Sequence, residues 1–122
     1  MTNEEQLELD FQDFLSNKKL PHFFYVHDAK GIFTYVSKNI TDLLGFTPEE
    51  FEIDYMGHLT ANPINKNVIQ HTHNALKGLE QKPYQLEIYD KKYIAHLLEV
   101  NEKPIFENNE VVGVEGVAIL LN

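Results

Sequence analysis

Cysteine, arginine and tryptophan are all absent from this chain of 122 residues. Without cysteine there can be no disulfide, no thiolate metal site, no cysteine nucleophile and no flavin bound through a cysteine. The lack of disulfides is typical of a cytoplasmic protein, and that is the location we expect. Without arginine, and with a formal net charge of −9, the chain lacks the clustered cations that bind nucleic acid or anionic lipid. We therefore expect neither of those partners.

Long apolar runs are missing as well. No segment approaches the roughly 20 apolar residues of a membrane span, so we expect no membrane insertion. The N-terminus, MTNEEQLELD, is acidic, whereas a secretory signal begins with basic residues. Hydrophobic residues make up 43% of the sequence, which is enough for the core of one globular domain. We expect an N-terminal amphipathic helix within residues 1–20 and a single domain over residues 21–122.

The N-terminal segment has the spacing of a helix with one apolar face. Leu7, Phe11, Phe14 and Leu15 follow the i, i+4, i+7, i+8 pattern, and acidic residues occupy the other side. Pro21 closes the segment, because the residue before a proline avoids the helical region.

The next segment predicts a β-hairpin over residues 23–28 and 32–36, with a turn between them. Alternation in the first strand would place Phe24 and Val26 on one face and Phe23, Tyr25 and His27 on the other. Ser37 is placed to cap a short helix that Gly45 ends. Thr47-Pro48-Glu49-Glu50 then starts another helical region, in which we expect Phe51 and Met56 to be buried.

The second half of the chain predicts one longer helix over residues 62–78 and three strands over 84–89, 93–104 and 111–121. The last strand is apolar on both faces, so it should be central and covered twice. The helices after Val36 can cover one face, and the other needs the N-terminal helix or a partner chain. The predicted fold is therefore α+β: a five-stranded antiparallel sheet with helices on one face and an N-terminal amphipathic helix.

This order of elements and four local segments resemble the PAS family of sensor domains over residues 21–121. The segments are Asp28-Ala29-Lys30-Gly31, Tyr35-Val36-Ser37, the run LLGFTPEEF ending at Phe51, and the C-terminal group of Val112, Val114, Glu115, Gly116 and Val117. The resemblance implies a PAS fold and a regulatory input module rather than an enzyme. It implies a small-molecule ligand between sheet and helices, or a homodimer, and a downstream output domain such as a histidine kinase or a diguanylate cyclase. That output domain is not in this sequence.

The resemblance implies a ligand cavity between the sheet and the helices. Counting about 100° per residue along the predicted helix places Ile64, Asn65, Val68 and Thr72 on its inward face, and this face and the strands supply the residues that would line the cavity. The candidate contacts are Asn65, Thr72, Val68, Ile64, Phe24, Val26, Met56, Leu98 and Val112. The same wall would include Leu44, Phe51, Leu86, Ile88, Val100 and Val114. Asn65 and Thr72 are the polar members and could orient a mostly apolar ligand. The same composition also allows a filled core without a ligand.

The ligand itself stays unknown. Haem-binding PAS modules place the axial histidine three residues before a hydrophobic pair, and the matching residue here is Asn65, which is a poor iron ligand. His71 is the alternative, at the edge of the buried face, while His73 points away. These two histidines are two residues apart on a helix and cannot hold one metal ion together. A non-covalent flavin remains open.

Two readings of the function follow from the sequence. The first is a sensory module that binds a small molecule and passes a conformational change through its sheet. The second is a homodimerisation module without a ligand, which would use the two-sided last strand. Many PAS modules join this strand to a signalling helix through an aspartate, and Leu120 stands at that position.

Overall fold

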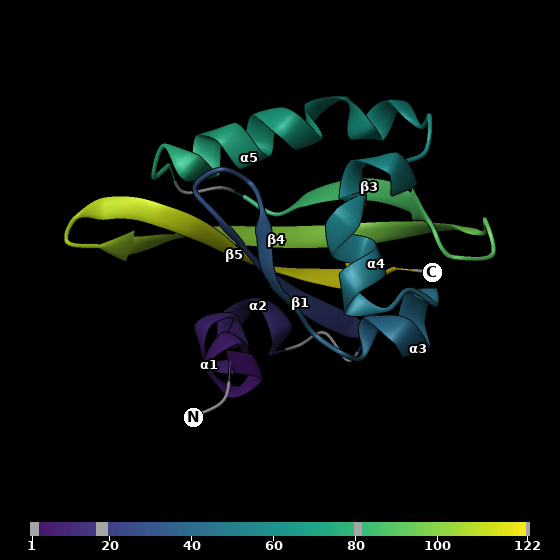
Figure 1. The fold of residues 1–122 in the computed structure, drawn as a ribbon, viewed down its shortest axis with the longest axis horizontal. Helices are drawn as coiled ribbons and strands as arrows, with labels where there is room; N and C mark the ends of the chain where they lie inside the picture. The colour runs from purple at the N-terminus through teal and green to yellow at the C-terminus, as the bar shows by residue number, and fades with distance from the viewer. Residues whose placement is uncertain (1–2, 17–19, 80–81, 122) are drawn as a thin grey trace.

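A five-stranded antiparallel sheet in the order β2-β1-β5-β4-β3 is the centre of the computed structural model, which describes residues 3–16, 20–79 and 82–121 (Figure 1). The strands are β1 His22–Asp28, β2 Phe33–Val36, β3 Tyr84–Tyr89, β4 Ala95–Glu107 and β5 Glu110–Leu120. The long last strand lies between β1 and β4, in the central position that its apolar character predicts.

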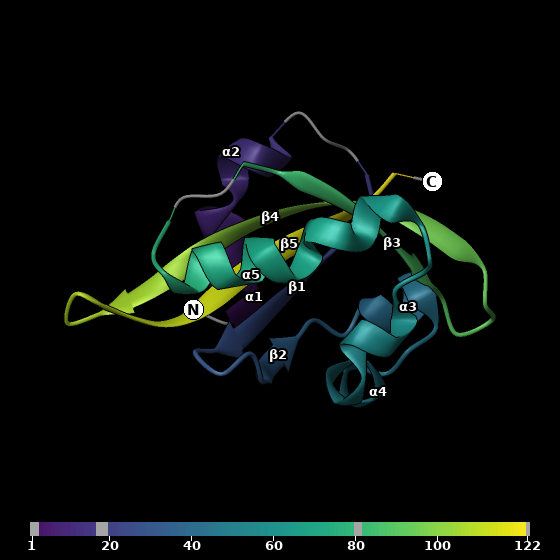
Figure 2. The same ribbon diagram turned by 90° about the horizontal axis from the view of Figure 1, so that it is seen from above.

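The helices lie on both sides of this sheet (Figures 1 and 2). The larger group consists of α3 Ile40–Leu44, α4 Pro48–Ile53, the 3₁₀ helices η1 Tyr55–His58 and η2 Pro63–Asn67, and α5 Val68–Leu76. The opposite face carries α1 Asn3–Asp10 and α2 Gln12–Leu15. The predicted α+β class, antiparallel sheet and N-terminal helix are therefore confirmed. Among the described residues, no helix has the length and apolar character needed to cross a membrane.

The N-terminal helices cover the second face of the last strand. Leu7 and Phe11 are buried against Phe24 of β1 and Val117 of β5, and the rings of Phe11 and Phe24 stack at 6.4 Å. The apolar stripe predicted from helical spacing thus finds its surface within the same chain. α1 and α2 pack directly on the sheet. The division into a segment 1–20 and a domain 21–122 stays a prediction.

A larger cluster fills the space between the sheet and the mid-chain helices. Its fully buried members are Phe23, Ile40, Phe51, Val68, Ile88, Leu98, Val100 and Ala118. Phe51 is a buried anchor as expected, but Met56 is 46% exposed and is not. Met56 lies in the single-turn η1 and lines a cavity that opens to the surface, which leaves nearly half of its side chain accessible.

Helix caps follow the sequence closely at one site and depart from it at another. Thr47 and Glu50 form the predicted capping box at the start of α4, and Gly45 ends α3 with a φ of +87°. Ser37 does not cap α3, because Asn39 occupies the N-cap position. The buried Ser37 hydroxyl instead accepts the backbone N–H of Phe24 at 2.9 Å, which ties the end of β2 to β1.

The helix predicted over residues 62–78 is divided. Asn62 caps it as expected, by accepting the N–H of Ile64 at 3.0 Å, but the first turn is the 3₁₀ helix η2. The α-helical part, α5, begins at Val68, and Gly78 with a φ of +79° follows its end.

The β1–β2 and β3–β4 turns each begin with an aspartate and have the same geometry. Asp28 and Asp90 each accept the N–H groups two and four residues later through one carboxylate oxygen, at 2.8 and 3.0 Å. The residue three after the aspartate takes a positive φ in each: Gly31 at +83° and Tyr93 at +64°. The second turn thus places a tyrosine where the first uses glycine, which has no Cβ to oppose that conformation.

Candidate functional site

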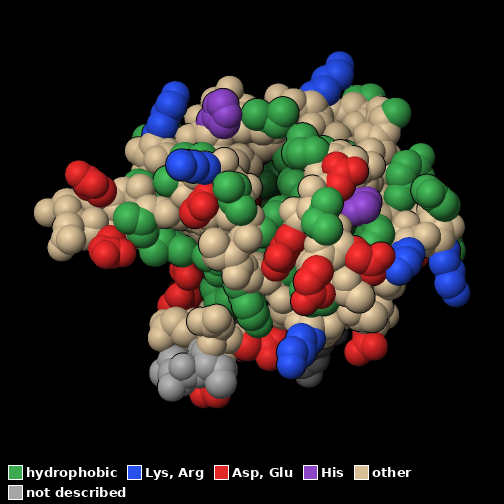
Figure 3. All heavy atoms as spheres, in the orientation of Figure 1, with side chains coloured by type: hydrophobic (Ala, Val, Ile, Leu, Met, Phe, Trp, Pro, Cys, Tyr) green, Lys and Arg blue, Asp and Glu red, His purple; other side chains and the backbone are tan. Residues whose placement is uncertain are grey.

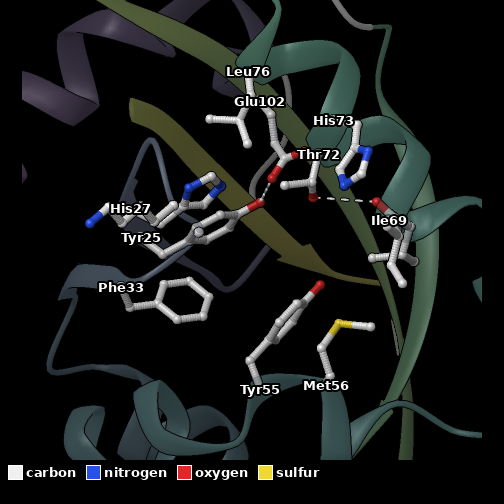
Figure 4. A pocket seen from close by; sticks show the side chains of 13 residues that line it. Tyr25, His27, Phe33, Tyr55, Met56, Ile69, Thr72, His73, Leu76 and Glu102 are labelled. Atoms are coloured by element: carbon white, nitrogen blue, oxygen red, sulfur yellow. Dashed lines mark hydrogen bonds between the residues drawn. The ribbon is translucent and has the colours of Figure 1, made fainter. Parts of the chain in front are cut away.

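A cavity of about 230 Å³ opens between α5 and the sheet, beside η1 and the β1–β2 turn (Figure 4). Its lining residues are Tyr25, His27, Lys30, Gly31, Phe33, Tyr55, Met56, Val68, Ile69, Thr72, His73, Leu76 and Glu102. In Figure 3 the surface is hollowed below α5, with mostly hydrophobic side chains around the hollow. The sheet, η1 and α5 each supply one wall, so the cavity exists only in the folded chain.

A buried carboxylate is one of the polar groups that line this cavity. Glu102 of β4 is 3% exposed, and its two oxygens accept hydrogen bonds from Tyr25 at 2.6 Å and Tyr84 at 2.8 Å. Burial, followed by the charge of Glu102, raises the pKa of both tyrosines far above the usual range. Both hydroxyls therefore keep their protons and act as donors. A buried carboxylate needs such donors, because it has lost its water.

Aromatic rings form the floor of the cavity. Phe33 of β2 meets Tyr25 and Tyr55 edge-to-face, with ring centroids 5.8 and 5.5 Å apart. Burial and then the charge of Glu102 raise the pKa of Tyr55, so its hydroxyl is protonated and points into the cavity in Figure 4. Gly116 of β5 makes room for this arrangement, because a Cβ there would clash with the ring of Tyr25.

His27 contributes a second buried polar group. It is 4% exposed, and its Nδ1 lies 2.9 Å from the carbonyl oxygen of Asp28. A carbonyl oxygen only accepts, so we assign the proton to Nδ1; in a neutral ring Nε2 is then an acceptor. Nε2 is buried and has no hydrogen-bond partner in the described part of the chain. Unpaired buried atoms of this kind are uncommon in folded proteins and mark a position where a partner is missing.

Solved structures with this architecture place the chain among known folds. A domain of a putative light and redox sensing histidine kinase from Haloarcula marismortui superposes with a TM-score of 0.67 at 13% identity, over 91% of this chain and 98% of its own. The N-terminal domain of a diguanylate cyclase with PAS/PAC sensor from Marinobacter aquaeolei gives 0.72 at 11% identity, over 83% and 95%. The PAS domain of a Colwellia psychrerythraea protein gives 0.66 at 16% identity, over 93% and 97%.

This chain has a PAS fold. The fold expected from the sequence is thereby confirmed, at identities that carry no information on the ligand. No protein-family model matches the chain, and no curated protein sequence matches it either.

Three of the nine candidate contacts line the PAS cavity: Met56, Val68 and Thr72. Thr72 donates its hydroxyl hydrogen to the carbonyl of Val68 at 3.3 Å, one turn earlier in α5. Whether any of the three touches a ligand stays a prediction.

Asn65 is placed differently from the expectation. Its amide accepts the N–H of Glu87 at 2.8 Å and donates to the carbonyls of Glu87 at 2.9 Å and Thr60 at 3.0 Å. The side chain thus pairs with the backbone of β3 as a neighbouring strand would. It is not among the cavity-lining residues, and its hydrogen-bonding groups are already used.

The remaining candidates also lie outside the cavity. Phe24 and Val26 face α1 and α2. Alternation along a strand fixes which residues share a face, but it does not fix which face of the sheet packs against the mid-chain helices. Leu98 is buried in the core between sheet and helices, away from the opening. Ile64 and Val112 are 37% and 38% exposed, since η2 turns Ile64 outward and Val112 lies towards the β4–β5 hairpin end.

The two helical histidines need one correction. His71 is half-buried, as expected, and stacks on Tyr84 with ring centroids 3.9 Å apart. His73 lines the cavity rim, although the sequence placed it pointing away. The helix begins later and with a tighter turn than predicted, which changes the directions of the side chains that follow.

Sequence reasoning missed the polar centre of the site, namely Tyr25, His27, Tyr55 and Glu102. A signal for Glu102 was present: Leu98, Val100 and Glu102 alternate along one strand, so a glutamate continues an inward-facing apolar row. A charged residue at such a position is buried only when it has partners. Leu120, at the position of the usual coupling aspartate, is 8% exposed and packs in the same core.

Proposed function

We propose that this chain is a sensory PAS module that binds a small molecule in the cavity below α5 and regulates an output domain outside the chain. The observation that carries the proposal is the cavity itself, with two buried polar residues in its wall: Glu102, and His27 with its unpaired Nε2. A core filled for stability alone would place apolar side chains at these positions. Structural neighbours come from a putative histidine kinase and a diguanylate cyclase, and they support a kinase or a cyclase as the class of output domain. The module would be regulatory rather than catalytic, and cytoplasmic.

The arrangement of the walls suggests how binding could be passed on. Tyr25 and Glu102 belong to β1 and β4, the two strands that flank β5. Val68 and Thr72 belong to α5, on the other side of the cavity. A ligand that contacts both walls would favour one spacing of α5 against the sheet, and only such a preference can shift the equilibrium between two states.

A cavity-filling variant tests the proposal. Thr72→Phe places a ring in the cavity, whereas Gln70→Phe introduces the same ring on the exposed side of α5. Both variants and the unmodified chain are screened against a metabolite panel by thermal shift and by two-dimensional NMR of the backbone amides. A cavity ligand should raise the melting temperature of the unmodified chain and of Gln70→Phe, and lose its effect on Thr72→Phe. Equal responses of all three, or no response to any compound, would contradict the proposal.

Homodimerisation without a ligand is the second reading, and it stays a prediction. The sequence suggests it through the last strand, which is apolar on both faces, and the amphipathic segment from Leu7 to Leu15. In the structure α1 and α2 already bury Phe24 and Val117 within the same chain. Light scattering on the intact chain measures its molar mass in solution and so its oligomeric state. A monomer at tens of micromolar would remove this reading.

A further inference from the structure

The polar atoms in the cavity wall are mainly hydrogen-bond acceptors. The carboxylate of Glu102 can only accept, and Nε2 of His27 is an acceptor when the ring is neutral. The hydroxyl hydrogen of Thr72 is directed to the carbonyl of Val68, which leaves the oxygen lone pairs. Tyr55 is a donor that points inward, and Lys30 and His73 stand at the exposed rim. A ligand that fits this wall must bring donors.

Glu102 retains capacity for further hydrogen bonds. Each carboxylate oxygen receives one tyrosine hydroxyl, and a carboxylate offers about four lone-pair sites in all. No lysine or histidine forms an ion pair with Glu102 within the ranges that the structure describes. Buried charges are usually paired, so the site lacks a cation or a strong donor.

His27 also lacks, among the described residues, a hydrogen-bond donor for one of its ring nitrogens. Nε2 is buried without a partner and its residue lines the cavity. An apolar ligand would leave this buried nitrogen unpaired. An anionic ligand would bring a negative charge next to Glu102, which is buried and unpaired by a cation.

The rings around these acceptors define the shape of the ligand. Tyr25, Phe33 and Tyr55 present aromatic surface, and aromatic faces favour both flat rings and cations. The space of about 230 Å³ admits a small bicyclic ring system and little more.

We propose that the cavity binds a small aromatic base whose N–H groups donate to the Glu102 carboxylate and to Nε2 of His27. This inference rests on the proposed function, since it names the class of ligand for that same cavity. The base carries at least two N–H groups, because the two acceptors belong to different strands, β4 and β1.

Three probes of equal ring size test the class of ligand. 2-Aminobenzimidazole carries N–H donors along one edge, benzofuran has none, and benzofuran-2-carboxylate replaces them by an anion. Binding to the unmodified chain is measured by calorimetry and by NMR shifts of the amides of His27, Tyr55 and Thr72. We expect 2-aminobenzimidazole to bind roughly tenfold to hundredfold more tightly than either other probe, as hydrogen bonds to a charged group allow.

Two variants test the residues. Glu102→Gln removes the charge but keeps the size of the side chain, and should weaken 2-aminobenzimidazole by roughly tenfold to hundredfold. Glu107→Gln makes the same change at an exposed position of the same strand and should leave binding unchanged. Amide spectra establish that both variants are folded. The comparison of probes on the unmodified chain stands even if Glu102→Gln does not fold.

The outcomes separate this inference from the proposed function. Tighter or equal binding of benzofuran or its carboxylate in the cavity would overturn the aromatic base and leave the small-molecule site standing. Unchanged affinity of 2-aminobenzimidazole in Glu102→Gln would also overturn it. If neither these probes nor the wider metabolite panel moves the cavity amides, both proposals fail.

Discussion

Replacing Asn65 by alanine should destabilise the protein itself, whatever its effect on a ligand. The side chain makes three hydrogen bonds to backbone groups of Glu87 and Thr60, at 2.8, 2.9 and 3.0 Å. These bonds hold η2 against β3 and so position the start of α5, which forms one wall of the cavity. Asn65→Ala removes all three bonds. The N–H of Glu87 and the carbonyl of Thr60 lose the partner that Asn65 supplied, whereas the carbonyl of Glu87 keeps the N–H of Thr60 at 3.1 Å.

The size of the effect follows from the number of bonds. Each hydrogen bond contributes about 0.5–1.5 kcal/mol to stability, so the loss of three amounts to about 1.5–4.5 kcal/mol in the free energy of unfolding. With a melting entropy of about 2.1 cal/mol/K per residue, 1 kcal/mol corresponds to roughly 4 °C in a chain of this length. The melting temperature should therefore fall by about 6–18 °C.

Urea unfolding followed by circular dichroism measures the change in the free energy of unfolding, and a thermal melt measures the melting temperature. Two further variants are compared with Asn65→Ala. Asn65→Asp keeps the acceptor for the N–H of Glu87 but loses both donors, so it should retain only a part of the stability. Asn67→Ala makes the same truncation two residues later, where the exposed side chain forms no capping hydrogen bond, and should change little. If Asn65→Ala were as stable as Asn67→Ala, the assignment of a structural role to Asn65 would be refuted.

Three further variants test other parts of the structure. Tyr93→Gly should stabilise the protein by about 0.5–1 kcal/mol in urea unfolding, because it relieves a positive φ at a side chain that is 83% exposed. Gly116→Ala should destabilise it by about 1–3 kcal/mol, since the new Cβ meets the ring of Tyr25. Burial, then a hydrogen bond with Asp10, raises the pKa of Glu115 to about 7. The folded state therefore holds this proton more tightly than the unfolded state, and stability should fall as the pH rises from about 4.5 to 7. Glu115→Gln should flatten that fall; an unchanged pH profile, or no effect of the other two variants, would count against the geometry described.

Local sequence signals were sufficient wherever one segment decides its own structure. The capping box at Thr47 and the left-handed residue at Gly45 follow from side-chain chemistry within a few positions. The alternation of β1 and the apolar stripe of the N-terminal helix were also read correctly. These are short-range properties, so the order of elements and the α+β class could be predicted.

The candidate site was predicted less well, because it depends on which surfaces meet. Asn65 was placed in the cavity on helical periodicity, yet a 3₁₀ turn and the edge of β3 gave its amide another partner. The prediction assigned Phe24 to the face of the sheet that lines the ligand cavity. In the structure α1 packs on Phe24, so this residue lies on the opposite face of the sheet. Neither outcome can be read from a periodicity, which is symmetric between the two sides of an element.

The sequence by itself determined the order of the elements, the α+β class, the PAS fold and the absence of cysteine chemistry. Only the tertiary structure decided where the cavity lies and that Glu102, Tyr25 and His27 meet there. Glu102 and Tyr25 are 77 residues apart in the chain, and their hydrogen bond forms because β1 and β4 flank the same strand. The chemistry of this site is a property of strand order, since the acceptors come from different strands and share one low-dielectric space.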